Sequence, residues 1–108
     1  MTVDFSKLNV LIVDDEPFML NLVQRVLKEF GVKHMTTATN GADALKVLET
    51  RDYNFDLIIC DLEMPVMDGF AFVKALREQS KFPNTSIPVL IVTGHSEPVR
   101  VQLITVSS

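Results

Sequence analysis

The sequence predicts an α/β fold in which a doubly wound parallel sheet carries helices on both faces. Three short runs are almost entirely apolar and do not alternate with polar residues: Leu8 to Val13, Phe55 to Cys60 and Val89 to Val92. A parallel strand that is covered on both faces has this composition. Between the runs, apolar residues recur at spacings of three and four, as in amphipathic helices. The predicted order of elements is therefore β-α-β-α-β-α-β.

The helix after the first run has a clear start and a clear apolar stripe. Pro17 suits a first helical turn, because it has no backbone N–H to leave unpaired. The stripe comprises Met19, Leu22, Val23, Val26, Leu27 and Phe30. A second, weaker strand is expected near Val32 to Thr37.

The second and third helices begin at capping residues. Asn40 is a candidate N-cap with Asp43 three residues later, and Asp68 is a candidate cap for a helix that begins near Gly69. The apolar residues that follow these caps are Leu45 and Leu48 in one helix and Phe72, Val73 and Leu76 in the other. The chain shows no internal repeat and no linker.

Composition excludes several classes of protein. The chain has 108 residues, of which 47% are hydrophobic, so residues 1–108 are expected to form a single domain. A net charge of −4 argues against direct nucleic-acid binding. The apolar stretches are too short to span a membrane, and the N-terminus lacks a signal-peptide pattern. The one cysteine, Cys60, lies in an apolar run and is interpreted as a core residue of a cytoplasmic protein.

Polar residues follow three of the predicted strands. Asp14 and Asp15 come after the first strand, Asp61 directly follows the "FDLIIC" run, and Thr93 follows the last strand. Parallel strands carry their binding sites beyond their carboxyl ends, so the three carboxylates converge if the first and third strands are neighbours. Such a cluster needs a positive partner. Oxygen ligands favour Mg²⁺, whereas His34 and His95 are isolated and offer no zinc pattern.

Each residue also has a plain structural interpretation. Asp14, Asp15 and Glu16 can supply the N-cap and first turn of the following helix, where the helix dipole stabilises acids. Asp68 is a better cap than catalyst, and Thr93 is a possible turn residue. The joint placement of these groups at the ends of three strands favours a functional site.

Four segments, in their order and separation, resemble the receiver domains of two-component response regulators: "VLIVDDEP", "ATNGADAL", "LIICDLEMPVMDG" and "PVLIVTGHSEP". The resemblance covers Leu8 to about Pro98 and implies a flavodoxin-like sheet. It also implies that Asp61 accepts a phosphoryl group and that Thr93 bonds it. By the same resemblance, Asp15, Asp61 and the backbone carbonyl of Glu63 hold Mg²⁺, with Asp14 acting through water.

The chemistry of phosphoryl transfer is compatible with these roles. A carboxylate beside Mg²⁺ can take a phosphoryl group in line from a donor such as phosphohistidine. The resemblance implies a sensor histidine kinase or phosphotransfer protein as the donor and a protein target downstream. Apart from its own phosphorylation and dephosphorylation, the chain is not expected to be an enzyme.

The C-terminal segment departs from the family pattern. Receivers normally continue into a fifth strand that ends in Lys and then a fifth helix, whereas "VRVQLITVSS" contains no Lys. The chain is therefore expected to be a truncated or altered receiver. The alternative is a receiver-shaped protein-binding module without phosphorylation. A haloacid-dehalogenase-type phosphatase and a flavodoxin fit less well, because the first strand lacks DxDxT and "DDEP" would repel phosphate.

The tail pattern predicts a strand instead of the usual fourth helix. Ser96-Glu97-Pro98 would start a helix acceptably, but the residues of Val99 to Val106 are largely β-branched and partly alternate with polar ones. We expect Val99 to Val106 to be extended and to cover a sheet edge. That edge belongs either to the same chain or to a second copy, which would make a homodimer.

Overall fold

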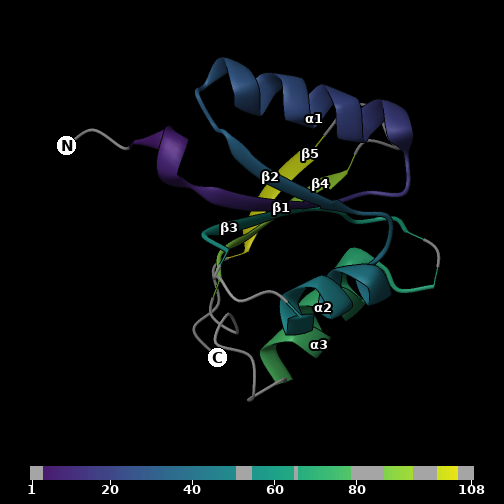
Figure 1. Cartoon of the computed structure of the whole chain (residues 1–108). Coiled ribbons are helices and arrows are strands. Elements are labelled where there is room, and N and C mark those ends of the chain that lie inside the picture. The colour runs from purple at the N-terminus through teal and green to yellow at the C-terminus, as the bar shows by residue number, and fades with distance from the viewer. Residues whose placement is uncertain (1–3, 51–54, 65, 79–86, 94–99, 105–108) are drawn as a thin grey trace.

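A computed structural model describes residues 4–50, 55–64, 66–78, 87–93 and 100–104 of the chain. After a short 3₁₀ turn, Phe5–Lys7, helices and strands alternate up to β4 (Figure 1). The elements are β1 (Asn9–Val13), α1 (Pro17–Glu29), β2 (His34–Ala38), α2 (Gly41–Thr50), β3 (Leu57–Asp61), α3 (Gly69–Glu78), β4 (Val89–Thr93) and β5 (Arg100–Ile104). The predicted β-α-β-α-β-α-β order is confirmed.

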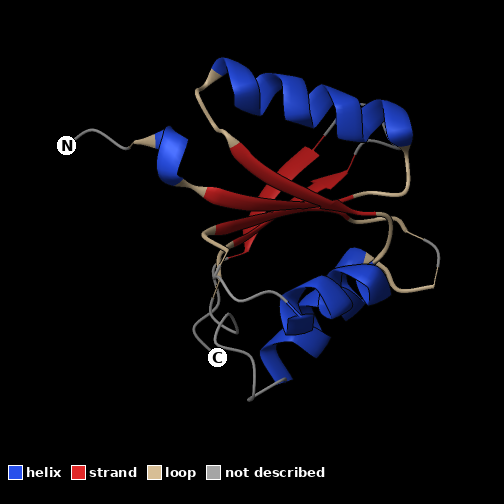
Figure 2. Ribbon diagram, in the orientation of Figure 1, coloured by secondary structure: helices blue, strands red, loops and turns tan. Residues whose placement is uncertain are grey.

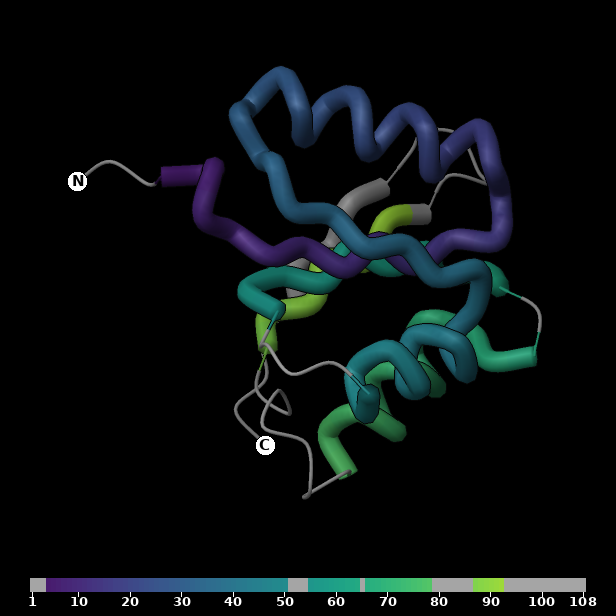
Figure 3. Tube along the Cα trace, in the orientation of Figure 1, coloured from purple at the N-terminus to yellow at the C-terminus, as the bar shows by residue number. Residues whose placement is uncertain are grey.

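The sheet has the order β2-β1-β3-β4-β5. The first four of these strands are parallel to their neighbours. Helix α1 covers one face of the sheet, while α2 and α3 cover the other (Figure 2). Figure 3 shows the same arrangement along the chain: α1, which follows β1, lies on one face of the sheet, and α2 and α3, which follow β2 and β3, lie on the other. The doubly wound arrangement predicted from the sequence is confirmed.

Adjacent residues of a strand serve the cores of opposite faces. In β1, Val10 and Ile12 belong to the cluster under α1, and Leu11 and Val13 belong to the cluster under α2 and α3. All four side chains are buried. Because both faces are covered, each of these four positions lies in apolar surroundings, which explains the continuous apolar run from Val10 to Val13.

The helix starts follow the capping signals of the sequence. Pro17 is the first residue of α1. The Asn40 side chain accepts a hydrogen bond from the backbone N–H of Asp43 at 2.8 Å. The Asp68 side chain accepts one from the N–H of Ala71, also at 2.8 Å. These bonds satisfy N–H groups that the first helical turn leaves without a partner.

The C-terminal segment confirms part of the prediction made for it. Residues 100–104 form β5, which pairs antiparallel with β4 from Thr93↔Arg100 to Val89↔Ile104. The segment therefore covers an edge of the chain's own sheet and runs opposite to the other four strands. Residues 99, 105 and 106, the possible helix start at 96–98 and His95 lie outside the described residues.

Two further expectations concern single features. Within the described ranges, no helix combines the length and the hydrophobicity needed to cross a bilayer. Cys60 is a free, fully buried thiol in β3, as expected of a core residue.

Candidate functional site

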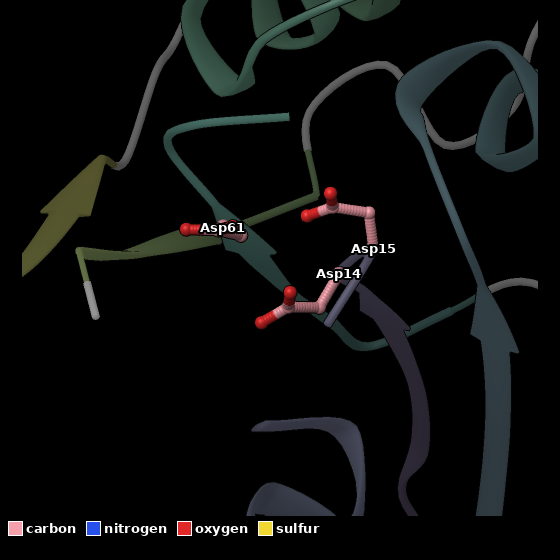
Figure 4. Close-up of side chains that lie close together, drawn as sticks. All are labelled: Asp14, Asp15 and Asp61. Atoms are coloured by element: carbon pink, nitrogen blue, oxygen red, sulfur yellow. The ribbon is translucent and has the colours of Figure 1, made fainter. Parts of the chain in front are cut away.

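The candidate site lies where β1 and β3 end side by side. These strands pair in parallel, with Val13 opposite Cys60, so the residues that follow Val13 meet the residue that follows Cys60. Figure 4 shows Asp14 and Asp15 on the segment that leaves β1, with Asp61 at the end of β3. The adjacency on which the predicted cluster depended is therefore present.

Three carboxylates share this small volume. Oxygen atoms of Asp14, Asp15 and Asp61 all lie within 4.8 Å of one another. Asp14 and Asp61 are the buried charged residues of the described chain, with 7% and 4% of their surfaces exposed, whereas Asp15 is exposed. The cluster thus has two acids set into the protein and one open to solvent.

Backbone hydrogen bonds fix the β1 side of the site. The N–H of Asp14 donates to the carbonyl of Ala38 at 3.0 Å, which ties the end of β1 to the end of β2. The Asp14 side chain accepts a hydrogen bond from the N–H of Glu16 at 2.9 Å. This turn lies just before α1, whose N-cap is Glu16, so Asp14 neither caps the helix nor lies in its first turn, and its carboxylate belongs to the cluster.

The β3 side is held from two directions. The N–H of Leu62 donates to the carbonyl of Val92 at 3.2 Å, and the N–H of Gly69 donates to the carbonyl of Leu62 at 2.8 Å. The Asp61 side chain accepts a long hydrogen bond, 3.4 Å, from the N–H of Glu63. Asp61 is therefore presented on a backbone that neighbouring elements restrain on both sides.

The thiol of Cys60 reports the electrostatic character of this region. Burial, followed by the negative charges of Asp61, Asp14 and Asp68, raises the pKa of Cys60 to about 12 from its ordinary value of 9.0. The thiol donates a hydrogen bond to the carbonyl of Asp61 at 3.3 Å. Both effects keep Cys60 protonated and unreactive at neutral pH.

The donor set fits a hard divalent cation. Carboxylate oxygens are the preferred protein ligands of Mg²⁺, which retains several waters and needs only one or two carboxylates. Two buried acids beside one exposed acid supply these oxygens and leave an open side for water. The double positive charge of one Mg²⁺ ion would also offset the mutual repulsion of the three carboxylates.

Three further residues named in the sequence analysis lie outside the carboxylate cluster: Glu63, Thr93 and His34. Glu63 is exposed and lies two residues beyond Asp61 on the same segment. The backbone of Thr93 ends β4 next to β3, but its side chain lies outside the described part of the structure. His34 begins β2 and is exposed, in line with its interpretation as a surface residue.

Sequence reasoning missed the structural part played by Gly69. A Cβ atom at this position would lie 2.8 Å from the carbonyl oxygen of Asp61 and 3.0 Å from the Cα of Leu62. Only glycine lets α3 start this close to the end of β3. The Asp-Gly pair at a predicted helix start was the available signal, but it cannot specify which backbone is approached.

Comparison with known proteins gives a consistent result. The family model described as the response regulator receiver domain matches residues 10–107. The sensor histidine kinase CheAY of Helicobacter pylori is 37% identical over 85 residues, covering 79% of this chain and 10% of that protein. The sensor histidine kinase GacS of Pseudomonas protegens is 38% identical over 88 residues, covering 81% of this chain and 9% of that protein.

A solved structure of chemotaxis protein CheY4 from Vibrio cholerae is also similar. It superposes with a TM-score of 0.67 at 40% identity, covering 84% of this chain and 72% of that chain. The chain spans about a tenth of the length of the two curated kinases and most of the length of this solved domain.

Proposed function

Because the chain belongs to the response regulator receiver domain family, we propose that it is the phospho-accepting receiver of a two-component system. In this proposal a phosphoryl group moves from a histidine kinase or a phosphotransfer protein to Asp61, with Mg²⁺ bound beside it. The family membership and the two-component context rest on the comparisons, whereas the transfer, the metal and the residue roles are inferred from the site.

One observation carries the proposal. Asp61 is a buried carboxylate at the tip of a central strand, with oxygens of Asp14 and Asp15 within 4.8 Å. A buried acid beside two others is costly unless hydrogen bonds and a positive charge offset it, and a bound Mg²⁺ would supply that positive charge. As an ordinary strand-end residue, Asp61 would have been more stable exposed to solvent.

The residues present divide the chemistry between them. A carboxylate oxygen of Asp61 forms the new O–P bond while the N–P bond of a phosphohistidine donor breaks, and the electron pair returns to the imidazole ring. Bound Mg²⁺ would neutralise charge on the transferring phosphoryl oxygens. Asp15 and the carbonyl of Glu63 would hold the ion together with Asp61, and Asp14 would hold one of its waters. The carboxylate of Asp61 is itself the nucleophile, so the transfer needs no general base.

Phosphorylation would add negative charge and three acceptor oxygens at the end of β3. The hydroxyl of Thr93, at the end of the adjacent β4, is the group proposed to bond them. A hydroxyl that turns toward the phosphoryl group would leave its former place, so a change at the site would alter the neighbouring surface. A downstream protein target would bind to that altered surface.

Intact-mass spectrometry with a small phosphodonor and Mg²⁺ tests the proposal. We expect the parent chain to gain the mass of one phosphoryl group and Asp61→Asn to gain none. Asp68→Asn is the matched control, since Asp68 is a carboxylate of the same region and Asn also caps helices well. A mass gain that survives Asp61→Asn would refute the assignment.

Magnesium binding is tested separately by NMR titration without a phosphodonor. Chemical-shift changes should centre on residues 14, 15, 61 and 63 and should be lost in Asp15→Ala. Changes centred elsewhere would exclude the proposed ion site, whatever the outcome of the phosphorylation assay.

A second candidate function is favoured by the sequence of the tail. The printed chain contains no lysine after Lys81, whereas the family pattern places a lysine at the end of its fifth strand as a fixed positive charge. Without that charge, the chain would act as a receiver-shaped binding module. The absence of any mass gain in the parent, together with normal Mg²⁺ binding, would support this alternative.

A further inference from the structure

The loop between β3 and α3 borders the acidic site and touches Asp61 at both of its ends. At its start, the N–H of Glu63 donates to the carboxylate of Asp61 at 3.4 Å. At its end, the N–H of Gly69 donates to the carbonyl of Leu62 at 2.8 Å, and a Cβ atom at Gly69 would lie 2.8 Å from the carbonyl oxygen of Asp61. Any change in the course of this loop therefore reaches Asp61 directly.

The loop contains a backbone conformation that its own sequence disfavours. Val66 has a φ of 72°, in the left-handed region, where a β-branched residue is strained. The side chain of Val66 is 86% exposed, so its own packing does not offset the strain. Strained residues persist only where the surrounding structure determines their conformation. The restraint on Val66 must therefore come from neighbouring residues of the loop.

Two methionines on either side of Val66 anchor the loop. Met64 is buried in the apolar cluster under α2 and α3, and Met67 is half-buried against the same cluster. Met67 also packs against Gly41, the first residue of α2. A Cβ atom at Gly41 would lie 2.9 Å from both Cγ and Sδ of Met67 and 3.1 Å from its Cβ, so glycine is needed to leave this space to the methionine. Figure 1 shows the loop passing the start of α2 before it enters α3.

We propose that Met67 is a positioning residue for the acidic site. By packing against Gly41, it holds the loop in the course that sets the carboxylate of Asp61 and the carbonyl of Glu63 for Mg²⁺. The contact itself is part of the structure, whereas its consequence for Mg²⁺ rests on the proposed function. Groups that orient the ligands of a metal without touching the metal commonly change its affinity by roughly tenfold or more.

Helix α2 is suited to be the fixed side of this contact. The Asn40 side chain caps its first turn by accepting a hydrogen bond from the N–H of Asp43 at 2.8 Å. Its inner residues Ala44 and Leu48 are buried in the same cluster as Met64. Helix α2 thereby supports the site although it contributes none of the three carboxylates.

Amide hydrogen exchange in EDTA tests whether Met67 holds the loop, independently of any metal or phosphodonor. The amide of Gly69 reports on the loop, because its hydrogen bond to Leu62 closes the loop, and the amides of β1 report on global unfolding. We expect Met67→Ala to accelerate exchange at Gly69 at least about fivefold more than exchange in β1. Val47→Ala is the matched control, because Val47 is also half-buried against the same cluster but lies six residues beyond Gly41 along α2. It should leave the ratio of the two exchange rates unchanged.

Magnesium titration measures the consequence for the site. Met67→Ala should weaken Mg²⁺ binding roughly tenfold. Met67→Leu, which keeps most of the side-chain volume, and Val47→Ala should bind Mg²⁺ as the parent chain does. Gly41→Ala should also weaken binding, because its methyl group displaces Met67. When Gly41→Ala and Met67→Ala are combined, that clash is absent, so the loss of binding free energy should be smaller than the sum of the two single losses.

The outcomes separate this proposal from the proposed function. Circular dichroism establishes that each variant is folded. An unchanged exchange ratio at Gly69 in Met67→Ala would overturn the proposal, as would a loss of Mg²⁺ affinity in Val47→Ala equal to that in Met67→Ala. A parent chain that does not bind Mg²⁺ would refute the proposed function instead, and the exchange ratio in EDTA would still decide whether Met67 holds the loop.

Discussion

Replacing the proposed phosphoacceptor by its neutral isostere should stabilise the metal-free protein. In Asp61→Asn the shape of the side chain is kept, but its repulsion with Asp14 and Asp15 is removed. Two unit charges 4.8 Å apart repel by about 3.5 kcal/mol at an effective dielectric constant of 20, and by about 0.9 kcal/mol in water. The buried Asp14 lies nearer the first value and the exposed Asp15 nearer the second.

The net gain in the free energy of unfolding of Asp61→Asn is smaller than the repulsion energy that the substitution removes. The asparagine oxygen is a weaker acceptor than a carboxylate for the N–H of Glu63, and that bond is already long at 3.4 Å. We therefore expect a gain of about 2 kcal/mol in the free energy of unfolding, which for a chain of this size corresponds to roughly 10 °C in Tm. Urea unfolding in EDTA measures it, with Asp68→Asn as the control that should change little.

Magnesium should reduce the difference in the free energy of unfolding between Asp61→Asn and the parent chain. An ion that binds the folded state stabilises it by an amount that grows with its concentration, and the parent has one more carboxylate with which to hold it. If Asp61→Asn were no more stable than the parent in EDTA, or if Mg²⁺ stabilised both equally, the inferred repulsion among the three acids would be wrong.

Three further predictions concern neighbours of the site. Gly69→Ala should lower the free energy of unfolding by about 2 kcal/mol or more in urea titrations, because its Cβ would lie 2.8 Å from the carbonyl of Asp61; an unchanged midpoint would contradict this. Val66 has a φ of 72° and is 86% exposed, so Val66→Asn should stabilise the protein by about 1 kcal/mol, measured in the same way, and a loss would show that its side chain packs. The pKa of Cys60 is about 12 when folded and 9.0 ordinarily, so above pH 9 the unfolded state loses its proton first and stability should fall by up to about 1.4 kcal/mol per pH unit until pH 12. Cys60→Ala should lack this part of the decline in unfolding measured between pH 8 and 11, and equal slopes would refute the assignment.

The sequence by itself determined the elements and their caps. Continuous apolar runs specified strands buried on both faces, and β1, β3 and β4 lie within two residues of the predicted bounds. The hydrogen bonds made by the side chains of Asn40 and Asp68 join residues three apart. Such features are readable because the interacting groups are close in sequence. The motifs around Asp15 and Asp61 likewise indicated the family, which the comparisons confirm.

Only the tertiary structure decided which strands are neighbours and what they bring together. The order β2-β1-β3 places Asp14 and Asp15 beside Asp61, more than forty residues away, and no local pattern specifies that pairing. The antiparallel direction of β5 depends equally on a distant partner, β4. The contact between Met67 and Gly41 exists because a loop and a remote helix border the same space. Strand order and such contacts follow from the packing of the whole chain, since each depends on residues that are distant in sequence.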